Sequence, residues 1–219
     1  MTDLDPLGWG LGPGVAVRLL RSNRALPDVL TPDEQARCDA FGSDDRRRQF
    51  ALGRTAARTL AAARLGGPPD AVALAVAADG APEVPGAHLS IAHTGRGEAA
   101  AAAAALAAVP VGVDLEAVRP RRPDLWRRIL RDDEQSVLAS LGGPSDDTQT
   151  LLWTLKEAVL KAQRTGFRAG GRSVRLTLNA DGSPPDRGRA SAHAEASGDW
   201  SLAFGREGDL WVAVAWSVG

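Results

Sequence analysis

Two carboxylates end an apolar, β-branched run at residues 111–116, whose sequence is VGVDLE. A strand sends alternate side chains to opposite faces, so Asp114 and Glu116 project from the same face while Leu115 points away. Two like charges this close together are unfavourable unless a positive group lies beside them. The segment therefore predicts either the solvated end of an edge strand or a site that holds a cation.

A third carboxylate lies downstream in the run 153–161, whose sequence is WTLKEAVLK. The pattern predicts a long helix that is capped near Ser145, on which Glu157 and Lys161 are four residues apart and share a face. Taken alone, this is an ordinary exposed Glu–Lys pair. Taken with the carboxylates of 111–116, it gives three acidic oxygen ligands without a usable thiol or His cluster, a set that suits a hard cation such as Mg²⁺.

The composition argues against nucleic-acid-binding, membrane and disulfide-rich proteins. The chain has 219 residues and is 44% hydrophobic, which suffices for one large domain or two small ones. Its net charge of -1 argues against a global attraction to nucleic acid or to an anionic membrane, and its single cysteine, Cys38, excludes an intramolecular disulfide framework. Residues 1–5 show no secretion signal and no apolar run is long enough to span a bilayer, so we expect a cytoplasmic protein.

The hydrophobic pattern predicts two lobes of similar organisation. In the first half we expect strands over 15–20 and 71–76, helices over 31–41 and 43–65, and a hairpin that pairs 88–92 with 98–106. The hairpin overrides the helical propensity of the Ala-rich residues 99–108, because they lie between a Gly-bounded turn and the segment 109–111. In the second half we expect helices over 125–130, 132–141 and 145–161, followed by strands.

Each half is therefore helix-rich first and then strand-rich. We predict an α+β fold of two similar α/β lobes, a pseudo-dimer, with the active site in the cleft between them. The N-terminal lobe comprises residues 1–110 and the C-terminal lobe residues 111–219.

The motifs resemble those of the 4'-phosphopantetheinyl transferases of the Sfp type. That family carries a Gly-x-Asp-x-Glu strand followed by a Trp-x-x-Lys-Glu-Ala helix, which here are residues 112–116 and 153–158. Its Ser-x-Ser-His-Ser/Thr-Gly element is similar to residues 90–95, and its Gly-Arg helix is similar to the helix that contains Gly53 and Arg54. The resemblance spans about residues 30–217, a length that matches the monomeric two-lobed form of the family.

The resemblance implies an enzyme of the holo-[acyl-carrier-protein] synthase type. It would move the 4'-phosphopantetheine arm of coenzyme A to a serine of an acyl or peptidyl carrier protein and release adenosine 3',5'-bisphosphate. Asp114, Glu116 and Glu157 would hold Mg²⁺, with the choice between Mg²⁺ and Mn²⁺ open, and with Glu116 binding either directly or through water. Glu157 would accept the serine proton, and Lys161 would stabilise charge on the pyrophosphate.

The resemblance also implies contacts to the phosphates of coenzyme A. The expected residues are His93 and Thr94 at one phosphate, Arg54 with one or more of Arg46, Arg47 and Arg48 at the 3'-phosphate end, and Arg37 as a weaker candidate. A row of helical arginines and a lone histidine also fit a solvated surface. The chain departs from the family at Ala81, where a basic residue is common in the Gly-Lys-Pro turn, and at Ala92, where the second serine is missing.

The basic segment 119–128 suggests where a carrier protein would dock. It contains five arginines, with Leu125 and Trp126 among them, and a basic rim around an apolar anchor suits an acidic helical partner. An ordinary solvated linker with Trp126 folded into the core explains the same composition. Two other functions stay open: a non-catalytic coenzyme A-binding paralogue and a Mg²⁺-dependent pyrophosphohydrolase. Secondary metabolism is the expected setting, but the sequence does not say which carrier is served.

Overall fold

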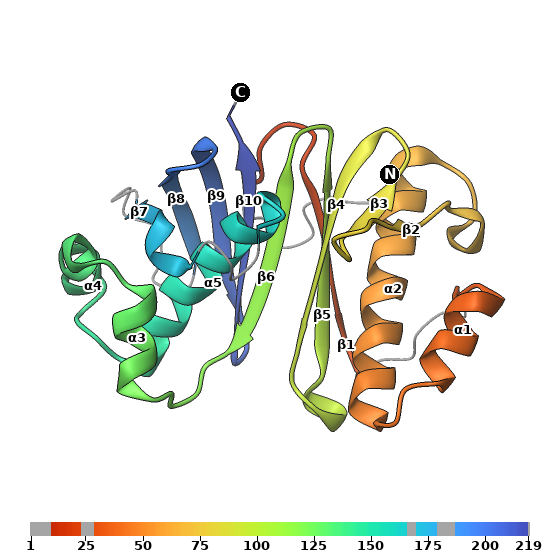
Figure 1. The fold of residues 1–219 in the computed structure, drawn as a ribbon, viewed down its shortest axis with the longest axis horizontal. Helices are drawn as coiled ribbons and strands as arrows, with labels where there is room; N and C mark the ends of the chain where they lie inside the picture. Colours follow the sequence, from red (N-terminus) through yellow and green to blue (C-terminus); the bar gives the residue numbers. More distant parts are fainter. Residues whose placement is uncertain (1–9, 23–28, 166–169, 179–186, 219) are drawn as a thin grey trace.

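The computed structural model describes all residues except 1–9, 23–28, 166–169, 179–186 and 219. Within them, two five-stranded antiparallel sheets and five α-helices form an α+β fold (Figure 1). The first sheet has the order β1-β5-β4-β3-β2, with strands Ala16–Arg21, Ala101–Ala107, Ala87–Thr94, Pro82–Val84 and Ala75–Val76. The second has the order β6-β10-β9-β8-β7, with strands Val111–Ala117, Leu210–Ser217, Gly198–Glu207, Arg187–Ala194 and Val174–Leu178. The helices are α1 (Pro32–Asp39), α2 (Asp44–Leu65), α3 (Pro123–Ile129), α4 (Gln135–Ser140) and α5 (Asp146–Ala162).

The predicted α+β class is confirmed, and so is the strand over the alanine run. The β4–β5 hairpin pairs His88 with Ala107 and Thr94 with Ala101. The strand predicted over 71–76 is wrong for most of its length: a 3₁₀ turn occupies Pro69–Ala71, and only Ala75–Val76 pair with β3. Pro68 and Pro69 favour a turn at this point because neither can donate a backbone hydrogen bond. Residues 1–5, in which we expected no secretion signal, lie outside the described residues.

The two sheets face each other, and each is covered on its outer face by one long helix (Figure 1). Between the sheets, Val113 and Leu115 of β6 pack with side chains of β1, β5 and β10 in one buried cluster. On the outer face of the first sheet, Leu60 of α2 packs against Leu106. On the outer face of the second, Leu155 of α5 packs against Leu202. The result is a stack of four layers, helix–sheet–sheet–helix, with a buried apolar cluster between the sheets.

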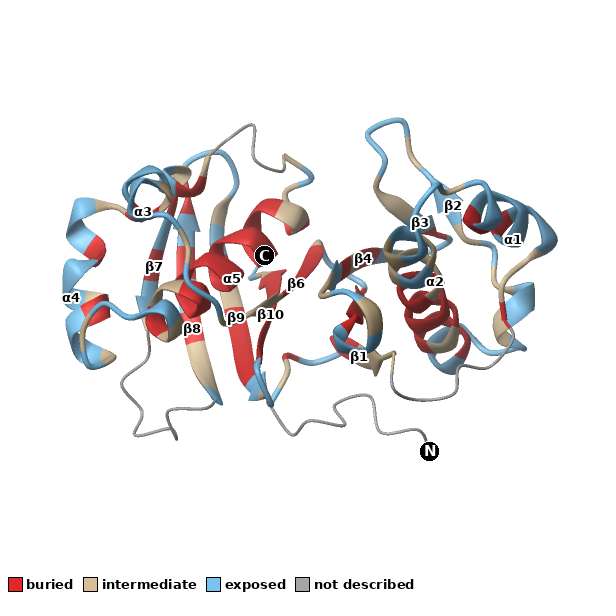
Figure 2. Ribbon diagram, turned by 90° about the horizontal axis from the view of Figure 1, so that it is seen from below, coloured by how far each residue is buried: buried red, intermediate tan, exposed pale blue. Residues whose placement is uncertain are grey.

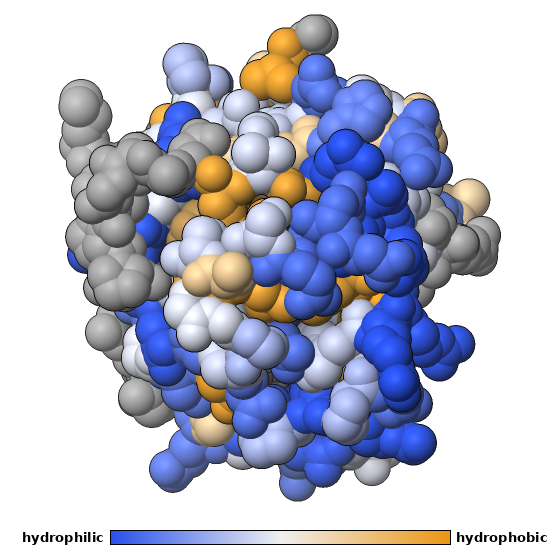
Figure 3. Space-filling view, turned by 90° about the vertical axis from the view of Figure 1, so that its left-hand side faces the viewer, coloured by the Kyte–Doolittle hydropathy of each residue, from blue (hydrophilic) through white to orange (hydrophobic). Residues whose placement is uncertain are grey.

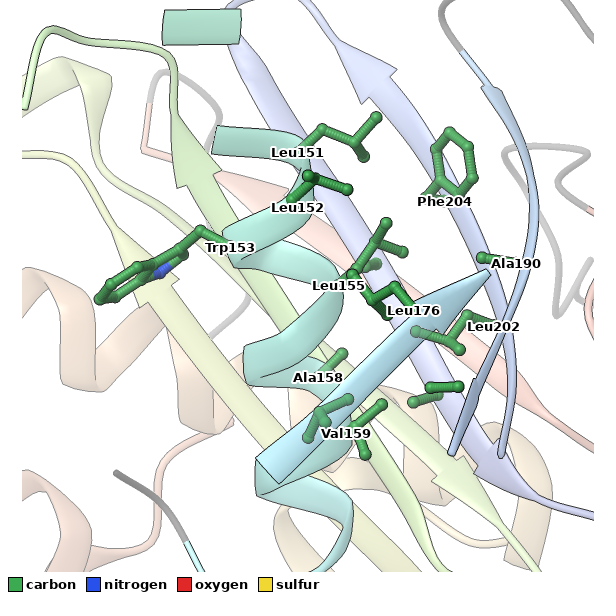
Figure 4. Packing of buried hydrophobic residues seen from close by; sticks show 14 of the residues in the cluster. Leu151, Leu152, Trp153, Leu155, Ala158, Val159, Leu176, Ala190, Leu202 and Phe204 are labelled. Carbon is green, nitrogen blue, oxygen red and sulfur yellow. The ribbon is translucent and has the colours of Figure 1, made fainter. Parts of the chain in front are cut away.

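Strand β10 shows how the sequence pattern builds these layers. Val212 and Val214 belong to the cluster between the sheets, whereas Trp211, Ala213 and Ala215 belong to the cluster beneath α5. This alternation is the two-residue period of a strand that is buried on both faces. Figure 2 shows the buried residues along α5, the inner part of α2 and the central strands, and Figure 4 shows the α5 side chains that enter the outer cluster.

The alanines of β5 are packed on both faces of the strand. Ala103 and Ala105 lie in the cluster between the sheets, and Ala104 lies beneath α2. Side chains this small let sheet and helix approach closely, so here the tertiary environment overrides the helical propensity of alanine.

Gly112 lets α5 lie directly on β6. A Cβ at this position would stand 2.0 Å from the carbonyl oxygen of Ala158 and 2.5 Å from the backbone nitrogen of Ala162. Because side chains alternate along a strand, Gly112 shares its face with Asp114 and Glu116. The missing side chain therefore brings the helix that carries Glu157 and Lys161 down onto the face that carries the two strand carboxylates.

The substitution Gly112→Ala tests this packing. The added methyl group would collide with helix backbone, so we expect a loss of about 1–3 kcal/mol in the free energy of unfolding, measured by urea denaturation. Gly42→Ala is the matched control, since a Cβ there meets nothing within 4 Å. Equal stability of Gly112→Ala and the wild type would show that the close approach of α5 to β6 is not needed.

Candidate active site

The motif residues of β6 and α5 meet above Gly112. The Lys161 ammonium donates a hydrogen bond to Asp114 Oδ1 over 2.6 Å. Glu157 lies one helical turn before Lys161, on the same face of α5, and both Glu157 and Asp114 are buried. Helix α5 is fixed at its start by a capping box in which Ser145 and Thr148 satisfy each other's backbone groups.

Burial and neighbouring negative charges make Asp114 and Glu157 unusually weak acids. Burial, aided by the negative charge of Glu116, raises the pKa of Asp114 to about 6 against the opposing effect of Lys161. Burial and then the charge of Asp114 raise the pKa of Glu157 to about 7. Asp114 Oδ2 is buried and finds no hydrogen-bond partner among the described residues. The negative charge of Asp114 and Glu157 is thus only partly neutralised, and an additional positive charge would stabilise the ionised form of both carboxylates.

The third predicted metal ligand, Glu116, is engaged by a cationic side chain. Arg121 donates a hydrogen bond to Glu116 Oε2 over 2.7 Å. In the described part of the chain, no group of three or more His, Cys, Asp or Glu side chains is arranged so that it could hold a metal ion. The chemistry of the donors nevertheless fits a hard cation, because Asp114 Oδ2 and Glu157 are buried carboxylate oxygens that lack a full complement of positive charge. The metal set Asp114, Glu116 and Glu157 stays a prediction.

The lysine of the helix motif is turned away from this site. Lys156 forms a buried ion pair with Glu134 over 2.7 Å and donates to the carbonyl oxygens of Ile129, Gly171 and Val174. Burial lowers the pKa of Lys156, and the Glu134 carboxylate opposes this effect. Lys156 therefore ties α5 to the segment after α3 and to the start of β7, while its neighbour Glu157 faces Asp114.

A cavity of about 660 Å³ lies between the two sheets' edges, beside Lys161. Ser90 and Ile91 of β4 line it from one sheet and Val111 from the other. The two strands are tied here by a hydrogen bond from the Val113 backbone N–H to Ser90 Oγ, over 3.1 Å. Residues of both predicted lobes line this cavity, and its size suits a small-molecule ligand. That it is the active-site cleft stays a prediction.

Arg164 bridges the mouth of this cavity. It leaves the end of α5 in a left-handed conformation, with φ of 59°, and makes two hydrogen bonds of 2.9 Å to the two carboxylate oxygens of Asp79. A third reaches Glu83 over 3.2 Å. The contact joins the second sheet's helix to the β2–β3 turn that contains Ala81. Sequence reasoning missed Arg164, because nothing in its neighbourhood marks an arginine that reaches another lobe.

A second cavity, of about 270 Å³, brings together four of the predicted phosphate-binding residues. Arg37, Arg46, Arg54 and His93 line it, and it shares Gly80, Pro82 and Ile91 with the larger cavity. Arg54 is buried, and its Nη1 finds no hydrogen-bond partner among the described residues. Partial burial, and then the charges of Lys161 and Arg46, lower the pKa of His93. The cavity therefore concentrates positive charge that an anion would neutralise.

An aromatic ring holds two of these arginines. The guanidinium carbons of Arg37 and Arg54 each lie 5.5 Å from the ring centroid of Phe50. Arg54 is also 3.5 Å from a Glu34 carboxylate oxygen, and Arg58 binds the other oxygen over 2.7 Å. The capping box of α1 fixes Glu34 in this position. The start of α1, which the sequence predicts, therefore also helps to orient Arg54 in the cavity.

Three other predicted residues do not line either cavity. Arg47 donates to the carbonyl oxygen of Phe41 and pairs with Asp44, and Arg48 donates to Ser22 Oγ over 2.8 Å. Thr94 lies at the end of β4, opposite Ala101. The helical period does not explain the difference, because Arg47 is seven residues from Arg54 and so lies close to the same face of α2. The contacts of Arg47 with Phe41 and Asp44, and of Arg48 with Ser22, hold these two side chains away from the cavity.

The basic segment 119–128 divides into an inward and an outward part. Trp126 is buried in the core of the second lobe, with its ring edge-on to Trp153 at a centroid separation of 6.4 Å, so it does not form an exposed apolar anchor. Arg121 is also turned inward, with a side chain that is 12% exposed. The other four arginines, Arg119, Arg122, Arg127 and Arg128, are exposed. Figure 3, which views the side that carries α3 and α4, shows hydrophilic side chains over much of this face.

Comparison with known proteins agrees with the motifs. Residues 110–215 match the family model described as the 4'-phosphopantetheinyl transferase superfamily. A "4'-phosphopantetheinyl transferase" of Bacillus subtilis is 26% identical over 159 residues, which cover 70% of this chain and 69% of that protein. A second Bacillus subtilis protein, "4'-phosphopantetheinyl transferase ffp", is 28% identical over 102 residues, which cover 46% of this chain and 44% of that protein.

Residues 110–215 are therefore similar to the 4'-phosphopantetheinyl transferase superfamily, and the two relatives are named as transferases of this kind. This confirms the resemblance at the level of the superfamily. The matched region contains both carboxylate motifs, from β6 to β10. Among the described residues, no helix is both long and apolar enough to cross a membrane.

The raised pKa values predict how stability depends on pH in the absence of divalent cations. A raised carboxyl pKa means that the folded state holds its proton more tightly than the unfolded chain. For Glu157 this stabilises the fold below pH 4.5, and the stabilisation is lost as the pH rises to about 7. We expect the free energy of unfolding of the wild type, relative to Glu157→Gln, to fall over this range by on the order of 1–3 kcal/mol.

Urea denaturation at several pH values, with a chelator present, measures this difference. Glu195→Gln is the control, because the Glu195 side chain is 73% exposed and its replacement leaves the pH profile unchanged. A constant difference between wild type and Glu157→Gln across the range would contradict the raised pKa.

Proposed function

We propose that this protein is a 4'-phosphopantetheinyl transferase of the Sfp type, which moves the phosphopantetheine arm of coenzyme A to a serine of an acyl or peptidyl carrier protein. The observation that carries the proposal is the meeting of Glu157 and Lys161 with Asp114 above Gly112, beside cavities that are lined by cationic side chains. The N-terminal lobe, residues 1–110, would bind the nucleotide of coenzyme A. The C-terminal lobe, residues 111–219, would supply the carboxylates and the carrier contact, and the enzyme would act as a cytoplasmic monomer.

The reaction forms a bond between the serine oxygen and the β-phosphorus of coenzyme A, and breaks the bond from that phosphorus to the oxygen shared with the nucleotide. The leaving group is adenosine 3',5'-bisphosphate. Glu157 takes the serine proton, since it is the carboxylate that α5 presents on the same face as Lys161 and opposite Asp114. Lys161, which already donates to Asp114, is placed to offset charge on the phosphates.

Asp114 and Glu157, with Glu116 beside them, would hold Mg²⁺. When bound, this ion would neutralise charge on the pyrophosphate and orient it for attack. The chain's own contribution is to keep the carboxylates buried and prearranged through the contact of α5 with β6. Whether Glu116 binds directly or through water depends on Arg121, which occupies one of its oxygens.

The smaller cavity would receive the nucleotide phosphates. Arg46 and Arg54 present guanidinium groups there, and Arg54 has a buried nitrogen that an anion could satisfy. His93 lines this cavity and feels the charge of Lys161, so it is suited to a phosphate nearer the reacting bond. Arg37 shares the cavity and is the best substitute for the basic residue missing at Ala81.

Intact mass measurement of an apo carrier protein, after incubation with coenzyme A and Mg²⁺, tests the proposal. We expect a phosphopantetheine adduct, and we expect Glu157→Gln to lower its rate of formation by about 10²–10⁴-fold while the exposed control Glu195→Gln leaves it unchanged. Loss of coenzyme A without an adduct would favour a Mg²⁺-dependent pyrophosphohydrolase. Binding without turnover would favour a coenzyme A-binding paralogue, and transfer by Glu157→Gln at the wild-type rate would refute the assigned base.

The carrier would dock on the exposed arginines of 119–128. Arg122 and Arg128 are the best probes, since both are exposed and neither lines the two cavities described above. Reversing both charges, with Arg122→Glu and Arg128→Glu, should raise the KM for an acidic carrier several-fold and leave the KM for coenzyme A unchanged. Arg64→Glu, on the exposed end of α2, is the control. Unchanged carrier kinetics in the double variant would remove this segment from the interface.

A further inference from the structure

Arg121 is set apart from the rest of its basic segment by burial. Its side chain is 12% exposed, whereas that of its neighbour Arg122 is 88% exposed. One nitrogen, Nη2, donates to Glu116 Oε2 over 2.7 Å. Arg121 is therefore largely buried and binds one carboxylate of the site, whereas the other arginines of the segment are exposed.

Trp153 supports Arg121 from beneath. The guanidinium carbon of Arg121 lies 5.1 Å from the centroid of the Trp153 ring, within the range of a cation–π contact. That ring is buried and packs edge-on against Trp126, so it cannot easily move. Figure 4 shows Trp153 leaving α5 on the side opposite to Leu155. Trp153 precedes Glu157 by four residues, so the two side chains share one face of α5. Arg121, which packs on Trp153, therefore lies over this same face of the helix.

The carboxylates of the site are therefore neutralised to different extents. Glu116 is compensated by Arg121 and one oxygen of Asp114 by Lys161, whereas Asp114 Oδ2 lacks a hydrogen-bond partner among the described residues. A divalent cation that takes Glu116 as a ligand must displace Arg121, but one that is held by Asp114 and Glu157 need not.

We propose that Arg121 is a positioning residue that competes with the divalent cation for Glu116 and so limits how tightly the cation binds. This inference rests on the proposed function in assuming that the carboxylates hold a divalent cation. With Arg121 in place, Glu116 is held toward Trp153, and the cation is left mainly to Asp114 and Glu157. Without its charge, all three carboxylates attract the cation.

Binding of Mn²⁺ to the protein without coenzyme A, followed by the loss of the free-ion EPR signal, tests this inference. Removing one positive charge at this range should tighten Mn²⁺ binding in Arg121→Gln by about 3- to 10-fold. Arg122→Gln is the matched control and should leave the affinity unchanged. Arg121→Lys, which keeps the charge, should return the affinity toward the wild type. If Arg121→Gln does not fold, Arg121→Met preserves an apolar stem over Trp153 and serves the same comparison.

The outcomes separate this inference from the proposed function. Unchanged or weaker Mn²⁺ binding by folded Arg121→Gln, with normal binding by the wild type, would overturn the competition and leave the metal site intact. A wild type that binds no Mn²⁺ would overturn the metal site and this inference together. Carrier modification, measured separately by mass, then reports whether transfer itself survives.

Discussion

The contact between α5 and β6 at Gly112 is the constraint on which the site depends. A helix backbone that touches a strand backbone leaves no room for a side chain, and only glycine meets this condition. The same contact sets Glu157 and Lys161 over Asp114. It also removes these groups from water, so the packing of the second lobe and the electrostatics of its carboxylates have one origin.

The price of this arrangement is two carboxylates that the protein does not fully neutralise. Lys161 compensates one oxygen of Asp114, and Arg121 compensates Glu116, but burial still raises the pKa of Asp114 to about 6 and that of Glu157 to about 7. Groups with such values are common at functional sites because an apolar environment adjusts their acidity to the chemistry. Under the proposed function, the same property would make the site responsive to an added cation.

The sequence predicts which side chains share a face of β6 and which share a face of α5, because each element has its own residue period. The two-residue period of 111–116 puts Asp114 and Glu116 on one face, and the four-residue spacing of Glu157 and Lys161 puts them on one face of a helix. The alanine strand was also predictable, because its flanking turns outweigh its propensity. The family resemblance linked strand and helix, which neither period could do alone.

Other features depend on tertiary contacts that leave no trace in a single sequence. Arg121 belongs by composition to an exposed basic row, yet it packs on Trp153 and binds Glu116. Lys156 and Lys161 both lie on α5, but one is buried against Glu134 and the other faces Asp114. Among the arginines of α2, Arg46 and Arg54 line a cavity, whereas Arg47 and Arg48 are held by Phe41, Asp44 and Ser22.

The effect of Mg²⁺ on thermal stability tests whether the carboxylates of β6 and α5 form a cation site. Because Asp114 and Glu157 ionise at pH values of about 6 and about 7, Mg²⁺ should raise the Tm of the wild type at pH 8 and do so much less at pH 5. Asp114→Asn should abolish the increase at pH 8. An equal response of the wild type and Asp114→Asn to Mg²⁺, or no response of the wild type at pH 8, would contradict the account.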